Sequence, residues 1–262
     1  MARFAVLVSL LTLLAVTLLA QTTPVSDPQA LSLAAKSVAA MSGGNAVSDV
    51  TLAGSVTWIA GSDTETGTAT LQAKGIGESR VELKLSGGRR TEIRNNSSGV
   101  PQGARTGTDG VRRSSAQHNC LTDPVWFFAG LSSLAAASNP KLVFVYVGPE
   151  QREGVSVQHL RLYQSLGSEP KTQNIIQRLS TLDFYLDPVS FLPLAITFKV
   201  HPDDDLTTDI PAEVRFANYQ AVNGILVPLH IQRLVNGGLL FDVVVTTAQV
   251  NTGLSDVPFS IQ

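Results

Sequence analysis

The sequence predicts a mainly β protein of the α+β class. We expect a curved antiparallel meander of about eleven or twelve strands that forms an incomplete barrel, with two or three helices on or inside its concave face. Apolar and polar residues alternate with a period of two over most of the chain after Gly44. Tight-turn signals such as Gly87-Gly88 and Asn236-Gly237 separate these segments and favour pairing between neighbours. Helical periodicity is confined to a few short segments.

The composition fits one globular domain rather than a disordered or nucleic-acid-binding chain. Of the 262 residues, 44% are hydrophobic and 15% are charged, which is too apolar for intrinsic disorder. The formal net charge of −2 leaves no overall basic excess, so no nucleic-acid partner is expected. The single cysteine excludes an internal disulfide and a zinc site built from paired cysteines.

The first twenty residues have the pattern of a secretory signal peptide. Arg3 precedes an apolar run from Phe4 to Ala20, and Pro24 follows in a polar stretch. We therefore expect cleavage after Ala20, export and a periplasmic location. Gln21, not cysteine, follows the expected cut, so lipid attachment there lacks its acceptor. An uncleaved membrane anchor is the alternative, because the run is near the lower length limit for spanning a bilayer.

Residues 21–262 are expected to form a single half-barrel domain that begins with a helix over about 28–41. Asp27 is a suitable N-cap, Pro28 suits the first helical position, and Gly43-Gly44 ends the helical pattern. The Asn, Ser, Gly and Pro content of residues 95–110 predicts a loop. Strands are expected over 50–58, 68–74, 80–85, 90–95, 142–147, 155–163, 182–186, 194–200, 213–219, 225–234 and 239–250.

The middle of the chain predicts a second helix over about 123–137, and a third, short one is expected over 172–179. Thr122-Asp123-Pro124 resembles a capped start, and three consecutive aromatic residues follow at 126–128. Neighbouring helical side chains point about 100° apart, so three such rings cannot share one stripe. The mid-chain helix is therefore either a plug that is buried on all sides or a movable lid whose aromatic rings line an apolar cavity.

Motifs for catalysis or for metal or phosphate binding are not found, so we expect no enzyme activity, no metal site and no cofactor. His118 and Cys120 are two residues apart and suggest either a thiolate–imidazole pair or, as we favour, a buried structural pair. The acidic run 203–205 suggests calcium, but Thr208 and Val214 stand where a calcium loop requires Gly and Glu. A solvated turn is the better interpretation.

Basic residues are concentrated between Lys74 and Arg113, where nine oppose four acidic residues. An anionic partner such as lipid headgroups or an acidic protein patch would suit this excess. The alternative, which we favour, is that these residues occupy ordinary outward-facing strand positions, because most of them alternate with apolar residues.

Three turn segments follow one another between residues 187 and 259. They are Asp187-Pro188-Val189-Ser190-Phe191-Leu192-Pro193, the stretch 216–228 from Phe216 to Pro228, and the stretch 250–259 from Val250 to Phe259. Together they resemble the outer-membrane lipoprotein-sorting carriers, the LolA-like periplasmic half-barrel proteins. The resemblance implies a half-barrel whose apolar concavity shelters acyl chains without catalytic residues. The strand arginine that latches the lid helices in those carriers has no matching position here.

Pattern and resemblance together predict an exported, non-enzymatic carrier that shelters the acyl chains of a lipid or lipoprotein and contacts the membrane transiently. The alternative is an envelope sensing or scaffolding module with a filled interior and a protein partner. A hydrolase that uses His118 and Cys120 ranks last. The candidate cavity residues are Trp58, Trp126, Phe127, Phe128, Leu131, Phe184 and Phe198.

Overall fold

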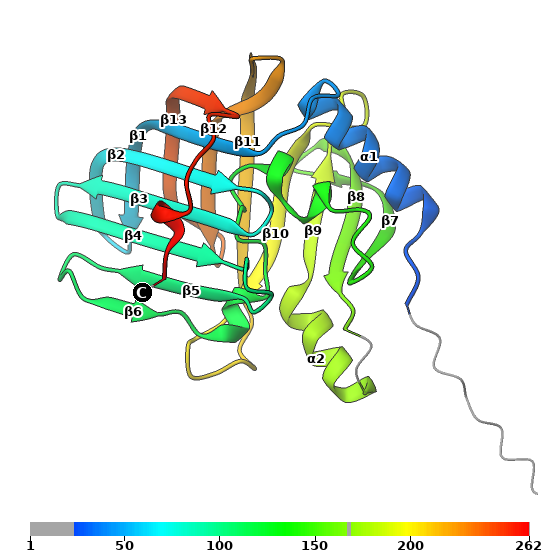
Figure 1. Ribbon diagram of the computed structural model, residues 1–262, viewed down its shortest axis with the longest axis horizontal. Helices are drawn as coiled ribbons and strands as arrows, with labels where there is room; N and C mark the ends of the chain where they lie inside the picture. Colours follow the sequence, from blue (N-terminus) through cyan, green and yellow to red (C-terminus); the bar gives the residue numbers. More distant parts are fainter. Residues whose placement is uncertain (1–23, 167–168, 262) are drawn as a thin grey trace, which may run out of the picture.

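The computed structural model describes residues 24–166 and 169–261, so the expected signal peptide over 1–20 lies outside the described residues (Figure 1). Within the described part of the chain, thirteen strands form a single sheet. The strands are β1 (Asp49–Ala60), β2 (Asp63–Lys74), β3 (Glu78–Leu85), β4 (Gly88–Asn95), β5 (Gln102–Thr106), β6 (Arg112–Ser114), β7 (Leu142–Arg152), β8 (Val155–Gln164), β9 (Leu182–Leu186), β10 (Pro193–Val200), β11 (Ile210–Val222), β12 (Ile225–Val235) and β13 (Gly238–Val250).

Every pairing in this sheet is antiparallel, and the order is β6-β5-β4-β3-β2-β1-β13-β12-β11-β10-β9-β8-β7. Each strand except β1 and its partner β13 therefore pairs only with its sequence neighbours. The two ends of the order, β6 and β7, stay apart, and the sheet curves without closing (Figure 1). The predicted incomplete antiparallel barrel is confirmed.

The strand count exceeds the expected eleven or twelve because part of the region expected to be a loop is extended. β5 and β6 lie between residues 102 and 114 and continue the sheet from β4. Their sequences, Gln-Gly-Ala-Arg-Thr and Arg-Arg-Ser, lack the apolar alternation that marks a half-buried strand. Backbone pairing of β5 with β4 and of β6 with β5 holds both in the sheet, and Ala104 of β5 is buried.

Helix α1 (Pro28–Ser42) lies against the concave face of the sheet, next to β7, β8 and β12 (Figure 1). The Asp27 carboxylate accepts a hydrogen bond from the Gln29 backbone at 2.7 Å and caps its start. Gly43, with a left-handed φ of 59°, ends it. Helix α2 (Pro170–Ser180) is the second helix and precedes β9. The described residues contain no helix long and apolar enough to cross a membrane.

The segment 123–137, expected to be one helix, is not helical as a whole. It contains two short 3₁₀ turns, at Ala129–Leu131 and Ser133–Ala135, joined by irregular backbone. The Ser132 hydroxyl caps the second turn by accepting from the Leu134 backbone at 3.2 Å. The irregular backbone turns several times in this segment. The rings of Trp126, Phe127 and Phe128, which could not share one stripe of a helix, are therefore all buried. We call residues 121–137 the plug.

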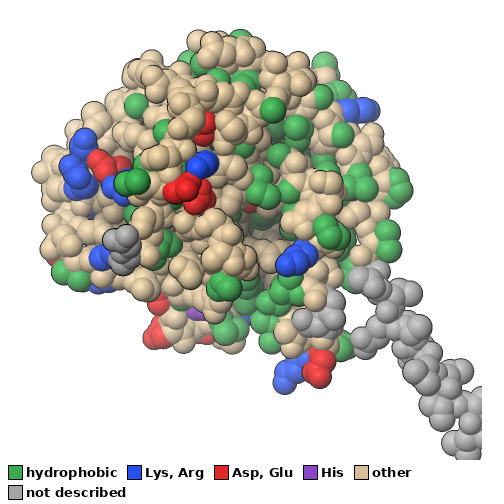
Figure 2. Space-filling model, viewed as in Figure 1, with side chains coloured by type: hydrophobic (Ala, Val, Ile, Leu, Met, Phe, Trp, Pro, Cys, Tyr) green, Lys and Arg blue, Asp and Glu red, His purple; other side chains and the backbone are tan. Residues whose placement is uncertain are grey.

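The core lies between the concave face of the sheet, α1 and the plug. Its largest fully buried side chains include Phe127, Phe128, Phe144, Phe184, Leu134 and Met41. On the outer face, the C-terminal segment crosses β3 and β4 and buries Phe259 completely (Figure 1). Figure 2 shows hydrophobic side chains over the part that carries α1 and β7–β9, and groups of charged side chains over the half that holds β2, β3 and β4.

The residues that carry the family resemblance act as turn anchors. The Asp187 carboxylate accepts from the backbones of Val189 and Ser190 at 3.1 and 2.6 Å, which fixes the turn before β10. The Tyr219 hydroxyl donates to the Pro193 carbonyl at 2.8 Å. These motifs therefore specify how hairpins are joined and lie apart from the cavities described next.

Candidate functional site: two chambers on the concave face

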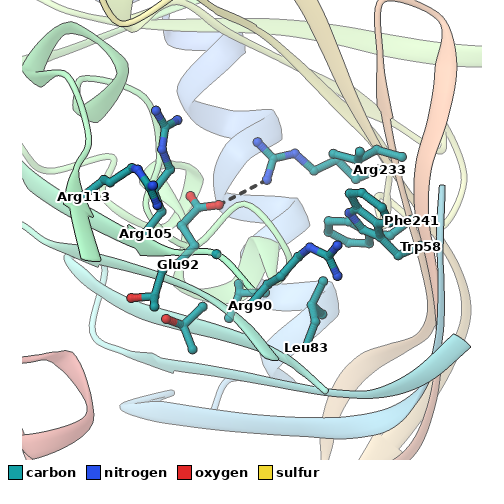
Figure 3. Close-up of a pocket in the computed structure, with 13 residues that line it drawn as sticks. Trp58, Leu83, Arg90, Glu92, Arg105, Arg113, Arg233 and Phe241 are labelled. Atoms are coloured by element: carbon teal, nitrogen blue, oxygen red, sulfur yellow. Dashed lines mark ion pairs between the residues drawn. The ribbon is translucent and has the colours of Figure 1, made fainter. Parts of the chain in front are cut away.

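A cavity of about 290 Å³, here called the first chamber, lies on the concave face (Figure 3). Strands β1, β3, β4, β5, β6, β12 and β13 contribute to its walls. Its apolar floor consists of Trp58, Val81, Leu83, Leu240 and Phe241. Its charged rim consists of Arg90, Glu92, Arg105, Arg113 and Arg233. The chamber therefore combines a surface for hydrocarbon with several guanidinium groups.

Strand register places the arginines inside the half-barrel. The β3–β4 hairpin pairs Leu83 with Arg90, and side chains of directly paired residues share one face of a sheet. The next pairings align Glu92 with Arg105, and Arg105 with Arg113. The expectation that the basic residues of this region point outward is wrong for these positions. Leu83 is buried on the concave face, so its partner lines the same interior.

Two of the rim arginines are held by acidic residues outside the chamber lining. Arg90 makes two hydrogen bonds to the Glu65 carboxylate, at 2.7 and 3.2 Å, and its guanidinium lies 4.1 Å from the centre of the Trp58 ring. The hydrogen bonds from Arg90 hold the pKa of Glu65 below its ordinary value. Arg113 makes a similar bidentate pair with Asp109, at 2.6 and 3.2 Å. These pairs fix the positions of the rim arginines.

A second chamber of about 210 Å³ adjoins the first and shares Glu92, Arg105 and Arg233 with it. Arg233 reaches Glu92 at 3.5 Å, and this ion pair lies at the boundary between the chambers (Figure 3). The Arg233 guanidinium also lies 4.7 Å from the centre of the Trp126 ring. Aromatic walls and charged groups therefore meet in the second chamber as well.

The loop between β10 and β11 closes the outer side of the second chamber. The Asn119 amide donates to the His201 carbonyl at 2.7 Å and accepts from the His201 backbone N–H at 2.8 Å. Arg105 makes an ion pair with Asp203 of the same loop. These contacts join the loop to the 3₁₀ turn Gln117–Cys120 and to β5.

The plug is tied to the sheet by a few polar contacts. The Ser79 hydroxyl of β3 donates to the Pro124 carbonyl at 2.6 Å, and Arg94 of β4 donates to the Thr122 carbonyl at 3.1 Å. Within the plug, the Asp123 carboxylate accepts from the Ser133 hydroxyl at 2.7 Å and from its backbone N–H at 2.9 Å. Burial raises the pKa of Asp123 to about 6.

The candidate cavity residues fall into three groups. Trp58 lines the first chamber, and Trp126 and Phe198 line the second. The remaining four lie in the packed core, at most 2% exposed, and line neither chamber: Phe127, Phe128, Leu131 and Phe184. The structure therefore brings together three of the predicted residues and adds Leu83, Phe241 and the rim arginines.

His118 and Cys120 lie in surroundings unlike those of a nucleophile and its base. Burial raises the pKa of the Cys120 thiol, which disfavours the reactive thiolate. The thiol is fully buried, and His118 Nε2 lies 3.0 Å from the Pro202 carbonyl.

Comparison with solved structures places this architecture in a known fold group. A Vibrio parahaemolyticus domain named for outer membrane lipoprotein sorting is 14% identical, with a TM-score of 0.59 over 88% of this chain and 96% of its own. A DUF1329 family protein from Desulfovibrio piger is 13% identical, with a TM-score of 0.56 over 91% and 98%. The chain shares its fold with these proteins.

A LolA superfamily protein from Nitrosomonas europaea has the same fold, with 11% identity and a TM-score of 0.55 over 88% of this chain and 97% of its own. No family model matches the sequence. No curated protein matches it either. At such identities the likeness extends to the fold alone, and it confirms the half-barrel group that the turn segments indicated.

Proposed function

We propose that this protein is an exported, non-enzymatic carrier that shelters the acyl chain of a lipid or lipoprotein in the first chamber. The observation that carries the proposal is a hollow of about 290 Å³ with an apolar floor, beside the packed core of the concave face. This volume is near the lower end of the roughly 300–1,000 Å³ typical of small-molecule pockets. The fold shared with LolA-superfamily and lipoprotein-sorting proteins supports the same role.

Burial of hydrocarbon is sufficient to hold such a ligand. Each methylene group removed from water contributes about 0.8 kcal/mol, so a chain segment in contact with Leu83 and Phe241 needs no covalent chemistry. A longer chain would require the plug to move outward during a transient contact with the membrane. Such movement would have to expose the buried rings of the plug as well as break the polar contacts that hold it to the sheet.

A pair of neighbouring variants tests whether the first chamber holds the chain. Leu83→Trp places a large ring in the chamber, whereas Lys84→Trp adds the same ring on the outer face of the same strand. Affinity for a fluorescent fatty acid should fall at least tenfold in the first variant and stay unchanged in the second. Equal affinity in both variants, or no binding by the unmodified protein, would contradict the proposal.

Export is tested separately by sequencing the N-terminus of the protein recovered from the periplasm of an expression host. The proposal requires Gln21 as the first residue. Recovery of an intact Met1 in the membrane fraction would instead support a retained anchor.

A second candidate function, an envelope sensing or scaffolding module with a protein partner, is favoured by the tight burial of Phe127, Phe128 and Leu131 in the plug. In this case the filled interior is permanent and the outer surface makes the contacts. Mass spectrometry of protein extracted under native conditions separates the candidates. The carrier is expected to retain lipid, whereas the scaffolding module is expected to retain none.

A further inference from the structure

Unpaired buried polar atoms are concentrated around the second chamber. Among the described residues, seven buried side-chain nitrogen or oxygen atoms have no hydrogen-bond partner. Four of them belong to residues that line this chamber: Arg94 Nε, Trp126 Nε1, His201 Nδ1 and Arg233 Nε. Arg94, Trp126 and His201 are each at most 6% exposed. Buried polar groups are nearly always paired, so four unpaired atoms around one cavity indicate a binding site.

The chemistry of these atoms selects an acceptor with negative charge. The two arginine nitrogens and the indole nitrogen are donors only. His201 Nε2 lies 2.9 Å from the Asp209 carboxylate, and its Nδ1 is buried without a partner among the described residues. The lining holds three arginines against Glu92 and Asp203, an excess of 3 − 2 = +1 with histidine neutral. An oxyanion would satisfy both the donors and the charge.

Arg94 contributes most to this argument because it is buried and makes no ion pair with a described residue. Its guanidinium donates to the Thr122 carbonyl at 3.1 Å, whereas the rim arginines of the first chamber each pair with a carboxylate. The buried Asp123 carboxyl acts on Arg94 only from beyond ion-pair distance, and an anion bound within hydrogen-bond reach would offset more of the cost of burying this cation.

We propose that the second chamber binds the phosphate or carboxylate headgroup of an amphiphile whose hydrocarbon tail occupies the first chamber. The chambers share Arg105 and Arg233, so a head joined directly to a tail reaches both. The Glu92 carboxylate at the boundary is paired to Arg233, which leaves Arg94, the arginine that lines the second chamber alone, to the ligand. This inference rests on the proposed carrier function and deepens it by naming the ligand class: amphiphiles with an anionic headgroup and a hydrocarbon tail.

The test is isothermal titration calorimetry with three probes on the full chain: dodecyl phosphate, uncharged dodecyl maltoside below its micelle concentration, and inorganic phosphate. Dodecyl phosphate should bind at least tenfold more tightly than the maltoside, because charge-assisted hydrogen bonds are added to the same tail. Arg94→Gln, which changes a residue of the second chamber alone, should remove most of this advantage and leave maltoside affinity unchanged, and Arg105→Gln should lower the affinity for dodecyl phosphate more than that for the maltoside. Arg89→Gln, exposed on the outer face of β4, is the matched control.

The outcomes separate this inference from the carrier proposal. Equal affinity for the charged and uncharged probes, or an unchanged preference in Arg94→Gln and Arg105→Gln, would overturn the headgroup site while the carrier stands. Binding of inorganic phosphate without binding of either alkyl probe would overturn the carrier and the amphiphile together. Arg105 is half exposed, so its variant keeps the test decisive if the Arg94 variant does not fold.

Discussion

The two ends of the concave face differ in what covers them. Under α1 and the plug, β7–β10 contribute Phe144, Leu160, Phe184 and Ile196, all completely buried. Beyond the plug, β4–β6 contribute four arginines and β12 a fifth, and these line two adjoining chambers. The same curved sheet is therefore a packed core at one end and a partly charged hollow at the other.

This difference separates stability from function within one continuous sheet. A packed core gains free energy from every buried methylene and loses several kcal/mol when a large side chain is removed. Hollows and unpaired buried donors cost free energy, and proteins retain such costs mainly at functional sites. The plug marks the border, since its rings fill the first region and one of them, Trp126, also lines the second chamber.

The largest expected effect compares one aromatic residue from each end. Phe184→Ala should lower the free energy of unfolding by about 3–5 kcal/mol, because the ring is completely buried and leaves a cavity. Trp58→Ala should cost about 1–2 kcal/mol, because its ring is partly exposed and already borders a hollow. Urea unfolding monitored by circular dichroism measures both. Equal losses would show that the two ends are packed alike.

The second prediction concerns the plug and pH. The pKa of Asp123 is about 6 in the folded protein against 3.8 ordinarily, so the folded state binds the proton more tightly. The stability that this group contributes is therefore present below about pH 4 and lost as the pH rises towards 6. Asp123→Asn abolishes this titration, so its stability relative to the unmodified protein should rise by about 2 kcal/mol between pH 4 and pH 7.

Chemical unfolding at both pH values gives the comparison. Asp109→Asn serves as the control, because its pairing with Arg113 lowers the pKa of Asp109 and predicts a small change of opposite sign. A stability difference for Asp123→Asn that does not vary with pH would mean that this carboxyl is not buried as a charged group.

The smallest effect on stability is expected at the loop that covers the second chamber. Asp203→Asn removes an ion pair with Arg105 whose side chains are both partly exposed, so stability should change by less than about 1 kcal/mol. Dissociation of dodecyl phosphate, followed by stopped flow, should nevertheless become slower, because the lining loses a negative charge and Arg105 is freed for the headgroup. Asp204→Asn in the same loop should leave the rate unchanged. Equal dissociation rates in the unmodified protein and in both variants would show that the loop does not affect release of the ligand.

Local patterns were sufficient to predict the half-barrel. Asn223-Gly224 and Asn236-Gly237 each take left-handed conformations in tight turns, as Asn-Gly sequences between apolar strands predict. The mid-chain segment could not be predicted in the same way. Its apolar residues have no period of their own, because the plug is shaped by the cavity it fills rather than by its local backbone preference.

The arginine site was missed for a specific reason. Ile93 is the one apolar residue of β4, and it suggests that the face of the strand opposite Arg90 and Arg94 is the buried one. Ile93 is indeed buried, but on the outer face, where the C-terminal segment around Phe259 covers β3 and β4. The hairpin register, which pairs Leu83 with Arg90, was the available signal for the interior position.

The occupant of the first chamber can be located most directly by fluorescence quenching. The protein has two tryptophans, so Trp126→Phe leaves Trp58, in the chamber wall, as the sole emitter. A fatty acid that carries bromine along its chain should quench this emission saturably, and a brominated water-soluble alcohol at the same concentration should not. Undiminished Trp58 emission at saturating fatty acid would contradict the claim that the plug-free end of the half-barrel holds a hydrocarbon chain.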